Sequence, residues 1–279
     1  MENQTGKIWF ITGISRGLGQ SLATAAMSRG HFVIGTFRQP AQVAAFNQAH
    51  AGRGYAFELD VTQSDRITQV AAAVTDRFGR VDVLVNNAGY GFAGAIEEAT
   101  EAEIREVFDT NFFGALRLTQ AFLPLLRGQK RGHIVQISSH GGVKAFPGFG
   151  VYNASKFALE GASEALAAEI APLGIKLTLV EPGPFRTGFA GEAFRQAATR
   201  LSDYEATAGA FRQRMAQVDG KQEGDPDKAA EAILQITELE NPPLRLPLGK
   251  IALASITAKL ESVQRDLEAW QEVAAKAVY

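Results

Sequence analysis

The sequence predicts an α/β protein in which a parallel β-sheet of about seven strands carries helices on both faces. Three observations support this fold class. Short apolar runs alternate with longer helical patterns, a glycine-rich turn follows the first run, and no linker interrupts the alternation before about residue 180. Parallel strands joined by helical crossovers form a doubly wound sheet, whose ligand crevice lies beyond the carboxyl ends of the strands.

Seven apolar runs have the length and composition of buried strands. Six of them precede residue 181 and one lies nearer the C-terminus. They are Lys7–Thr12, His31–Thr36, Tyr55–Leu59, Val81–Val85, His133–Ser138, Ile175–Val180 and Leu244–Leu248.

Helical patterns that are rich in alanine and bounded by glycine or proline fill the intervals. Asp225-Pro226-Asp227 resembles a further helix start, because proline is favoured in a first turn. The other patterns are Gly17–Arg29, Ser64–Phe78, Glu101–Leu126, Tyr152–Ala171 and an amphipathic terminal helix over Ala254–Ala275.

The composition narrows the class of protein. Hydrophobic residues make up 46% and charged residues 21%, which is ordinary for a soluble globular enzyme. A formal charge of -2 gives no basic excess for nucleic acid, and the charge-free stretches 39–52 and 83–96 are too short to cross a membrane. The absence of cysteine excludes disulfides and thiolate chemistry, and the N-terminus lacks the pattern of a signal peptide. We expect a cytoplasmic protein with no nucleic-acid or membrane partner.

The first predicted strand ends in the segment TGISRGLG, residues 12–19, directly before a helix. Glycines at such a turn allow a pyrophosphate to approach the backbone amides and the positive end of the helix. Glycine spacing alone is weak evidence, since many glycines at this kind of turn serve only the turn. The position after the first strand favours a dinucleotide site.

The end of the second strand predicts a preference for NADP. Sites for NAD commonly place an acidic residue there, which accepts hydrogen bonds from the ribose hydroxyls. This chain has Thr36-Phe37-Arg38 instead. Arg38, with Ser15 and Arg16 of the glycine-rich turn, offers a hydroxyl and two guanidinium groups to a ribose 2′-phosphate. The alternative is that Arg38 is a solvated surface residue.

Three polar side chains are expected to converge in the crevice. Ser139 follows the fifth strand, and a glycine-rich loop then returns the chain to Tyr152 and Lys156, which share one face of a helix. A phenol has a pKa of about 10, and we expect the Lys156 ammonium to lower the pKa of Tyr152 so that it can serve as an acid or base. Ser139 would then hydrogen-bond the substrate oxygen. The four histidines lack paired metal-ligand spacing, so no metal is predicted.

These motifs resemble those of the short-chain dehydrogenase/reductase family in its ordinary-length form. TGxxxGxG, NNAG, a serine followed thirteen residues later by YxxxK, and PG followed by threonine occur in the family's order over residues 7–190. The resemblance implies a Rossmann-like fold and a single domain over residues 1–279, since one crevice must collect motifs from Gly13 to Thr187. It also implies hydride transfer between a nicotinamide cofactor and an alcohol or carbonyl, and the residues after the second strand predict NADP as this cofactor.

The resemblance further implies the site residues. A catalytic tetrad follows from it, in which Tyr152 delivers a proton, Ser139 steadies the oxygen, and Lys156 relays protons with a water held by the fourth member. The tetrad is Asn111, Ser139, Tyr152 and Lys156. The implied cofactor-binding residues, besides Tyr152 and Lys156, are Gly13, Ser15, Arg16, Gly17, Leu18, Gly19, Arg38, Asp60, Val61, Asn87, Ala88, Gly89, Pro182, Gly183, Phe185 and Thr187.

Aromatic residues after the PG motif predict a lid and an apolar substrate pocket. The segment 184–224 is the expected lid, and its aromatic side chains with those of the preceding loops suit a hydrophobic ketone or alcohol. The predicted pocket residues are His140, Phe146, Phe149 and Phe189. Many of these aromatic side chains are equally compatible with ordinary core packing, and His140 with a surface loop.

Two other classes of protein remain open at this point. A non-catalytic dinucleotide-binding or sensing protein would share the fold but has little need for the complete tetrad. A sugar-nucleotide epimerase or dehydratase also uses Tyr and Lys, but it usually has a larger substrate domain. We expect a homodimer or homotetramer, because oligomers are usual for the family, with the terminal helix either covering the domain or joining the interface.

Overall fold

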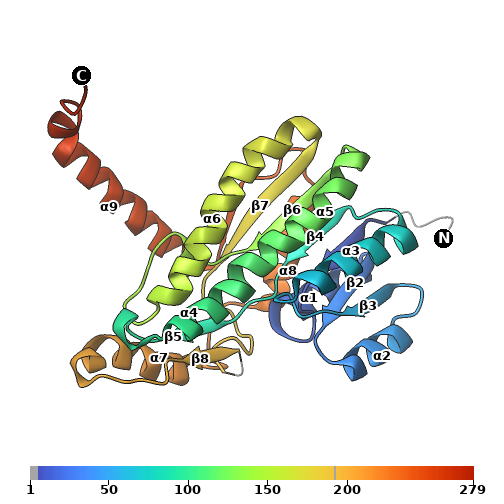
Figure 1. Cartoon of the computed structure of the whole chain (residues 1–279), viewed down its shortest axis with the longest axis horizontal. Coiled ribbons are helices and arrows are strands. Elements are labelled where there is room, and N and C mark those ends of the chain that lie inside the picture. The colour runs from blue at the N-terminus through green and yellow to red at the C-terminus, as the bar shows by residue number, and fades with distance from the viewer. Residues whose placement is uncertain (1–5, 192) are drawn as a thin grey trace.

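A seven-stranded parallel sheet forms the centre of the computed structural model, which describes residues 6–191 and 193–279 (Figure 1). The strand order is β3-β2-β1-β4-β6-β7-β9, and every neighbouring pair is parallel. The strands are β1 (Ile8–Ile11), β2 (Phe32–Phe37), β3 (Gly54–Glu58), β4 (Val83–Asn86), β6 (Gly132–Ile137), β7 (Ile175–Pro182) and β9 (Arg245–Leu248). The predicted fold class and all seven predicted strands are confirmed, with ends that shift by one or two residues.

Helices cover both faces of the sheet, because successive side chains of a strand point to opposite faces. Ile8 and Phe10 of β1 pack in one core with α3, α5 and α6, whereas Trp9 and Ile11 pack in the other with α1, α2 and α8. The helices are α1 (Gly17–Ser28), α2 (Pro40–Ala49), α3 (Ser64–Phe78), α4 (Glu101–Phe108), α5 (Ala115–Gln129), α6 (Gly150–Ile170), α7 (Ala210–Val218), α8 (Pro226–Glu238) and α9 (Lys250–Ala274).

The predicted helix over Glu101–Leu126 is helical throughout, but it is not a uniform α-helix. A π-helical segment, η2 (Asp109–Gly114), separates α4 from α5. A π-helical turn needs wider hydrogen-bonded rings than an α-helix and commonly marks a functional position. Asn111 lies within it, and its side chain bonds outside the helix, as described below.

Helix α2 and the short strands β5 and β8 were not predicted from the sequence. Helix α2 has only Phe46 buried, so it shows little apolar periodicity. The three-residue strands β5 (Gly91–Ala93) and β8 (Phe194–Gln196) form a separate two-stranded parallel sheet. This small sheet joins the loop after β4 to the segment after β7, and so it positions the predicted lid. Four 3₁₀ turns and a second π-helical segment complete the described elements: η1 (Ile96–Glu98), η3 (His140–Gly142), η4 (Ala171–Leu173), η5 (Ser202–Tyr204) and η6 (Glu205–Gly209).

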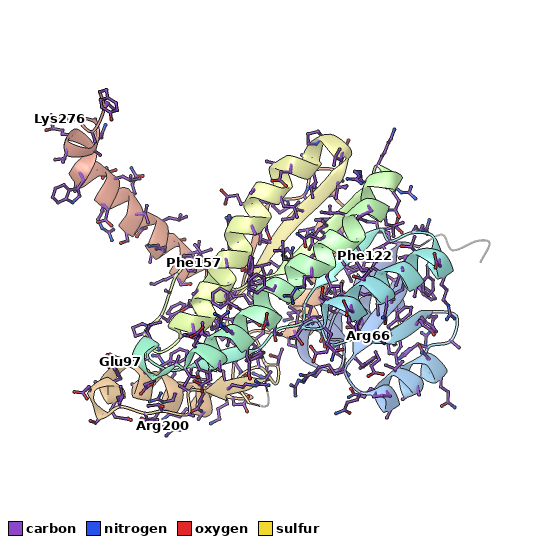
Figure 2. All side chains as sticks on the ribbon, in the orientation of Figure 1. Arg66, Glu97, Phe122, Phe157, Arg200 and Lys276 are labelled. Atoms are coloured by element: carbon purple, nitrogen blue, oxygen red, sulfur yellow. The ribbon has the colours of Figure 1, made fainter. Side chains whose placement is uncertain are left out.

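The terminal helix α9 leaves the body of the molecule (Figure 1). Figure 2 shows Lys276 at its far tip and Phe157, on α6, near its base. In the part of the chain that the structure describes, no helix is both long and apolar enough to span a lipid bilayer.

Candidate active site

The carboxyl ends of four strands meet at one edge of the sheet, and the predicted motifs follow these ends. Gly13 follows β1, Asn87 follows β4, Ser139 lies just beyond β6, and Pro182 ends β7. Because these strands are neighbours in the order β1-β4-β6-β7, the fold brings together loops that are far apart in the sequence. This is the crevice expected of a doubly wound sheet.

The turn between β1 and α1 suits an anion. Gly13 and Gly17 have φ angles of 69° and 58°, a backbone region that favours glycine. A Cβ at Gly19 would lie 2.4 Å from Asn87 Nδ2, so glycine is needed there. Among the described residues no side chain caps the start of α1, and its first turn carries no acidic residue. The amides of this turn, including that of Leu18, therefore fit the phosphates of a dinucleotide.

Thr12 and Asn87 lock the glycine-rich turn to the end of β4. Asn87 Nδ2 donates to the carbonyl oxygens of Thr12 and Gly13 at 2.8 and 3.1 Å. Thr12 Oγ1 accepts the backbone N–H groups of Asn87 and Ala88 at 2.9 and 3.0 Å. The Asn87 side chain therefore holds the glycine-rich turn in place.

Ser139 and Tyr152 are buried together beyond the end of β6. Ser139 Oγ accepts the backbone N–H of Gly141 at 2.9 Å, which caps the 3₁₀ turn η3 and fixes the hydroxyl. Tyr152 lies in the first turn of α6 and forms a side-chain hydrogen bond with Ser139. Two of the four predicted tetrad side chains are thus in direct contact.

Tyr152 is a neutral phenol in this structure. Burial raises the pKa of Tyr152 to about 12, and the hydrogen bond with Ser139 opposes this rise only in part. Phe149 stacks on the phenol with ring centroids 4.2 Å apart, and Phe189 meets its edge at 5.7 Å. The predicted lowering of the Tyr152 pKa by Lys156 is therefore not found in this structure, because burial of the phenol dominates the shift. The neutral phenol is the form that donates a proton.

Lys156 is buried one helical turn beyond Tyr152. Its Nζ donates to the carbonyl oxygen of Ile137 at 2.8 Å. Burial lowers the pKa of Lys156 to about 8, and the Glu160 carboxylate opposes this change. The ammonium is thus largely protonated at neutral pH. A Cβ at Gly89 would lie 3.6 Å from Lys156 Nζ and 3.1 Å from Asn111 Oδ1, so the NNAG segment passes beside both tetrad members.

Asn111 links the π-helical segment η2 to the NNAG loop. Its Oδ1 accepts the backbone N–H of Tyr90, and its Nδ2 donates to the Tyr90 carbonyl oxygen, both at 3.0 Å. Nδ2 also donates to Ser155 Oγ on α6 at 3.2 Å. The Asn111 side chain is 1% exposed, which excludes the reading of a helix-surface polar residue. Asn111 and Lys156 thus lie beside the NNAG loop, whereas Ser139 and Tyr152 lie beside Gly141 in the loop after β6.

Asn153 is a positioning residue that the sequence reasoning missed. Its Nδ2 donates to the Gly141 carbonyl oxygen at 2.8 Å, and its Oδ1 accepts the backbone N–H of Phe146 at 2.9 Å. These bonds hold the loop between Ser139 and α6 in place. The only sequence signal is a polar residue directly after Tyr152, which is common on helices for unrelated reasons.

The residues predicted to bind a 2′-phosphate lie at the ends of β1 and β2. The backbone N–H of Gly13 donates to Thr36 Oγ1 at 3.1 Å, which holds the glycine-rich turn against β2. Ser15 and Arg38 are exposed and Arg16 is half-buried. The segment Thr36-Phe37-Arg38 contains no carboxylate, and the binding of a 2′-phosphate by these residues stays a prediction.

The adenine-side residues follow β3. Asp60 Oδ1 accepts the backbone N–H and the hydroxyl of Thr62 at 2.9 and 2.8 Å, which forms a turn before α3. Val61 is buried, and a Cβ at Gly114 would lie 2.9 Å from its side chain. A contact of Asp60 and Val61 with adenine stays a prediction.

The segment after β7 covers the glycine-rich turn. A Cβ at Gly17 would lie 3.2 Å from Thr187 Cβ, so the PG loop reaches the start of α1. The Gly183 backbone N–H donates to the Leu248 carbonyl oxygen at 2.9 Å. The Phe185 ring packs against Gly224, in the loop before α8. The predicted lid 184–224 includes residue 192, which is outside the described residues.

A buried ion pair holds part of the segment predicted to be a lid. Arg212 of α7 contacts Glu98 of η1 at 2.7 Å, and both side chains are buried. The hydrogen bond from Arg212 lowers the pKa of Glu98 to about 2, although burial opposes it. Glu98 also accepts the backbone N–H groups of Ala95 and Leu201. One carboxylate therefore joins α7 to the loop that follows β5.

The predicted pocket residues fall into two groups. Phe149 and Phe189 contact the Tyr152 ring, as described above. His140 and Phe146 contact each other with ring centroids 5.0 Å apart, and His140 Nδ1 lies 2.9 Å from Ser255 Oγ of α9. Burial lowers the pKa of His140 to about 4, so this imidazole is neutral. Only the first group lies directly at the tetrad.

The sequence comparison decides the family. Residues 7–198 match the model of a family described as short chain dehydrogenase, and this range contains the glycine-rich turn and the whole tetrad. The chain belongs to the short-chain dehydrogenase family. The resemblance predicted from TGxxxGxG, NNAG and YxxxK is therefore confirmed, and the protein is an oxidoreductase of this type.

Relatives of this short-chain dehydrogenase cover nearly its whole length. Oxidoreductase BOA17 of Botryotinia fuckeliana is 39% identical over 96% of this chain and 97% of its own. The 3-ketodihydrosphingosine reductase of Bacteroides thetaiotaomicron is 39% identical over 88% of each. The crystal structure of a short-chain dehydrogenase from Streptomyces avermitilis is 44% identical, covers 99% of this chain and 100% of its own, and has a TM-score of 0.92.

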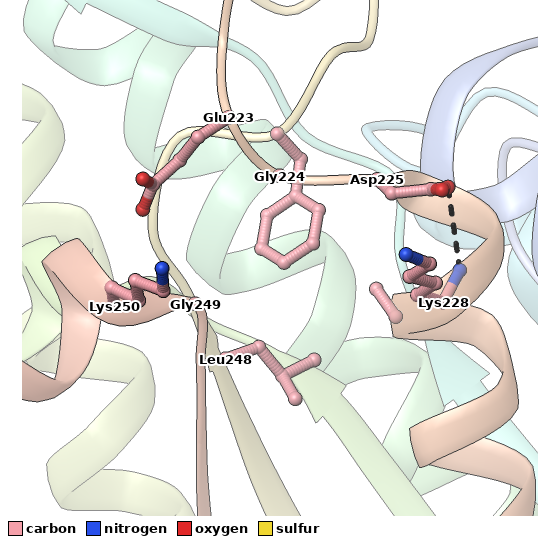
Figure 3. A pocket seen from close by; sticks show the side chains of 9 residues that line it. Glu223, Gly224, Asp225, Lys228, Leu248, Gly249 and Lys250 are labelled. Atoms are coloured by element: carbon pink, nitrogen blue, oxygen red, sulfur yellow. Dashed lines mark hydrogen bonds between the residues drawn. The ribbon is translucent and has the colours of Figure 1, made fainter.

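A hollow of about 320 Å³ in this short-chain dehydrogenase lies behind the PG loop (Figure 3). Its walls come from the loop before α8, the first turn of α8, the end of β9 and the start of α9, with Glu223, Lys228, Leu248 and Lys250 around it. Phe185 is part of its lining, whereas Ser139, Tyr152 and Lys156 are not. The hollow is thus separate from the tetrad.

Proposed function

We propose that this short-chain dehydrogenase interconverts a hydrophobic ketone and its secondary alcohol with NADP(H), without a metal, and with Tyr152 as the proton donor. One observation carries the proposal. Ser139 contacts Tyr152, and Lys156 and Asn111 line the same loop, directly beside a glycine-rich turn that fits a dinucleotide. A protein that only binds or senses a dinucleotide has no use for a desolvated phenol and ammonium at this place.

The residues of this chain supply the proton chemistry. A bound nicotinamide would supply the hydride for the carbonyl carbon, and the amides of Gly17, Leu18 and Gly19 would hold its phosphates. Tyr152 holds a proton on its phenol at neutral pH and gives it to the carbonyl oxygen, which Ser139 also hydrogen-bonds. Lys156 remains a protonated neighbour below a pH of about 8.

We assign the supply of protons from solvent to Lys156 and Asn111. Asn111 bonds the backbone on both sides of Tyr90 and thereby fixes the loop next to Lys156. We assign to Lys156 and Asn111 the return of a proton to Tyr152 after each reduction. This assignment explains why a polar pair is buried here at the cost of desolvating an ammonium.

The preference for NADP rests on Arg38, Ser15 and Arg16. A guanidinium group pairs with a phosphate through charge-assisted hydrogen bonds, and a carboxylate for ribose hydroxyls is missing from the end of β2. The solved structure of ElxO with NADP bound is 25% identical, covers 90% of this chain and 100% of its own, and has a TM-score of 0.74. That protein supports NADP as a cofactor of this fold.

The substrate class rests on the aromatic side chains at Tyr152. Phe149 stacks on the phenol, and Phe211 and Phe194 extend the same cluster with centroid distances of 4.8 and 6.0 Å from Phe149. Such a surface favours an aliphatic or aromatic group beside the reacting carbonyl. The Bacteroides relative is a reductase for 3-ketodihydrosphingosine, a long-chain ketone, which supports the same class.

A ketone panel tests the proposed function. The full chain is assayed with NADPH or NADH and ketones of increasing chain length, and nicotinamide absorbance is followed. We expect kcat/KM to rise by about threefold to fourfold for each methylene that the pocket buries, at about 0.8 kcal/mol each, and to be higher with NADPH. Activity confined to small polar ketones would overturn the substrate class, and a clear preference for NADH would overturn the cofactor assignment.

A further inference from the structure

Helix α9 carries an unpartnered apolar stripe away from the body of the molecule. Its base is attached, since Ala252 is buried and Ser255 lies 2.9 Å from His140. Farther along, Leu260 is 60%, Leu267 63% and Trp270 64% exposed. The helix projects beyond the other elements, as Figure 1 shows. Exposed apolar groups gathered in this way mark an interaction surface.

The stripe has the spacing of a coiled-coil seam. Its members alternate at intervals of three and four residues over three heptads, and all are exposed except Ile256 near the base, which is half-buried: Leu253, Ile256, Leu260, Val263, Leu267, Trp270 and Ala274. Side chains at this spacing fall on one line along the helix and insert between the side chains of a facing helix. The occupant that fits is therefore a second helix of matching length, about 37 Å for 25 residues.

The charges on α9 argue against a lipid surface as the occupant. Helices that lie on anionic membranes are rich in Lys and Arg on their polar face. Helix α9 has three basic residues and four acidic ones, so its polar face is close to neutral. Charges of both signs beside an apolar seam are typical of helix pairs instead.

We propose that α9 pairs in antiparallel orientation with α9 of a second copy of this chain. Antiparallel pairing about a two-fold axis between residues 261 and 262 sets the two halves of the stripe against each other. Leu260 then faces Val263 of the second copy, Ile256 faces Leu267, and Leu253 faces Trp270. Each contact occurs twice, as an isologous interface requires.

The flanking charges fit this orientation. Lys259 and Asp266 occupy equivalent positions beside the seam, one heptad apart. In the antiparallel pair, Lys259 of each copy faces Asp266 of the other, which gives two ion pairs. In a parallel pair, Lys259 would face Gln264, and the bulky Trp270 would face its own copy. Exposed ion pairs contribute little free energy, but flanking charges set register and orientation.

The oligomeric mass of the full chain tests the proposal. The variant Leu260→Asp/Leu267→Asp charges the seam, and Ala258→Asp/Ala269→Asp adds the same charges at exposed positions off the seam. By light scattering over a range of concentrations, we expect the seam variant to have half the mass of the wild type and of the control. Equal masses for all three, or a wild type that is monomeric at every concentration, would overturn the proposal.

Engineered cysteines test the orientation, because the chain contains no cysteine and the introduced thiols are the only ones present. Under mild oxidation, a mixture of Lys259→Cys and Asp266→Cys proteins should form a covalent dimer, whereas each protein alone should not. A covalent dimer from Leu267→Cys alone would indicate a parallel pair and would contradict the proposed geometry. Vesicles containing phosphatidylglycerol that bind the wild type and the control, but not the seam variant, would assign the stripe to lipid and overturn the pairing.

Discussion

The ring of Phe149 stacks on the ring of Tyr152 with centroids 4.2 Å apart and an interplanar angle of 20°. The contact is part of the burial around the phenol, whose ordinary pKa of about 10 already keeps it protonated at neutral pH. Burial raises the pKa of Tyr152 to about 12, so the phenol carries its proton at every physiological pH. An enzyme that reduces carbonyl groups needs this form before each turnover.

Replacing Phe149 with leucine should rehydrate the phenol and lower the pKa of Tyr152 toward about 10, the ordinary value. Spectrophotometric titration of tyrosinate, taken as a difference against the same protein with Tyr152→Phe, measures this pKa. Phe194→Leu is the matched control, since its ring touches Phe149 rather than Tyr152. An unchanged titration in Phe149→Leu would contradict the role of the stack.

Removing the Asn111 side chain should reduce both stability and turnover. Asn111→Ala leaves a buried N–H and carbonyl of Tyr90 without their partners, which costs about 2–4 kcal/mol of unfolding free energy in urea, and kcat should fall at least tenfold. Asn47 likewise forms two hydrogen bonds with the backbone N–H and carbonyl of a single residue, Ala56, which is remote from the site. Asn47→Ala should lose similar stability and keep its kcat, and a comparable loss of kcat in both variants would reduce Asn111 to a structural residue.

Arg38→Glu should change the cofactor preference. A carboxylate repels the 2′-phosphate and can accept hydrogen bonds from ribose hydroxyls, so the ratio of kcat/KM for NADPH to that for NADH should fall by roughly tenfold to a hundredfold. Arg53→Glu places the same charge change at an exposed position directly before β3. This position lies at the amino ends of the strands, whereas the crevice lies at their carboxyl ends. If the ratio moved equally in both variants, Arg38 would have no specific part in phosphate binding.

Arg212→Met should loosen the lid. The substitution leaves the Glu98 carboxylate buried without its cation, and breaking a buried pair in this way costs about 3–5 kcal/mol. Thermal unfolding should show a lower Tm, and KM for the ketone should rise because α7 is no longer held to η1. Arg214→Met, an exposed position on the same helix, should leave both values unchanged. A wild-type KM in Arg212→Met would separate the ion pair from substrate binding.

Much of the fold could be predicted because the strands of the large sheet are buried on both faces. β1 and β2 are continuous apolar runs, and the glycine-rich turn after β1 identifies the crevice edge. The small sheet of β5 and β8 was not predicted because three residues are too few to show the alternation of apolar and polar side chains that indicates a strand. Helix α2 escaped because Phe46 is its single buried side chain.

The tetrad could be identified by motif, but its physical state could not. The π-helical turn at Asn111 depends on bonds to Tyr90, which lies 21 residues earlier in the sequence. The raised pKa of Tyr152 comes from burial of its phenol in the folded protein, whereas the sequence shows only that Lys156 is four residues away. The π-helical turn and the pKa of Tyr152 thus depend on contacts between segments that are distant in the sequence, and the spacing of nearby residues does not predict such contacts.

The most direct test of the proposed function is Tyr152→Phe, which removes only the hydroxyl. NADPH-dependent reduction of a long-chain ketone should fall by about 10²- to 10⁴-fold, the usual contribution of general acid catalysis. NADPH binding, followed by nicotinamide fluorescence, should stay within about twofold, and the Tm should not fall. A variant that binds NADPH and retains full turnover would contradict the assignment of Tyr152 as the proton donor.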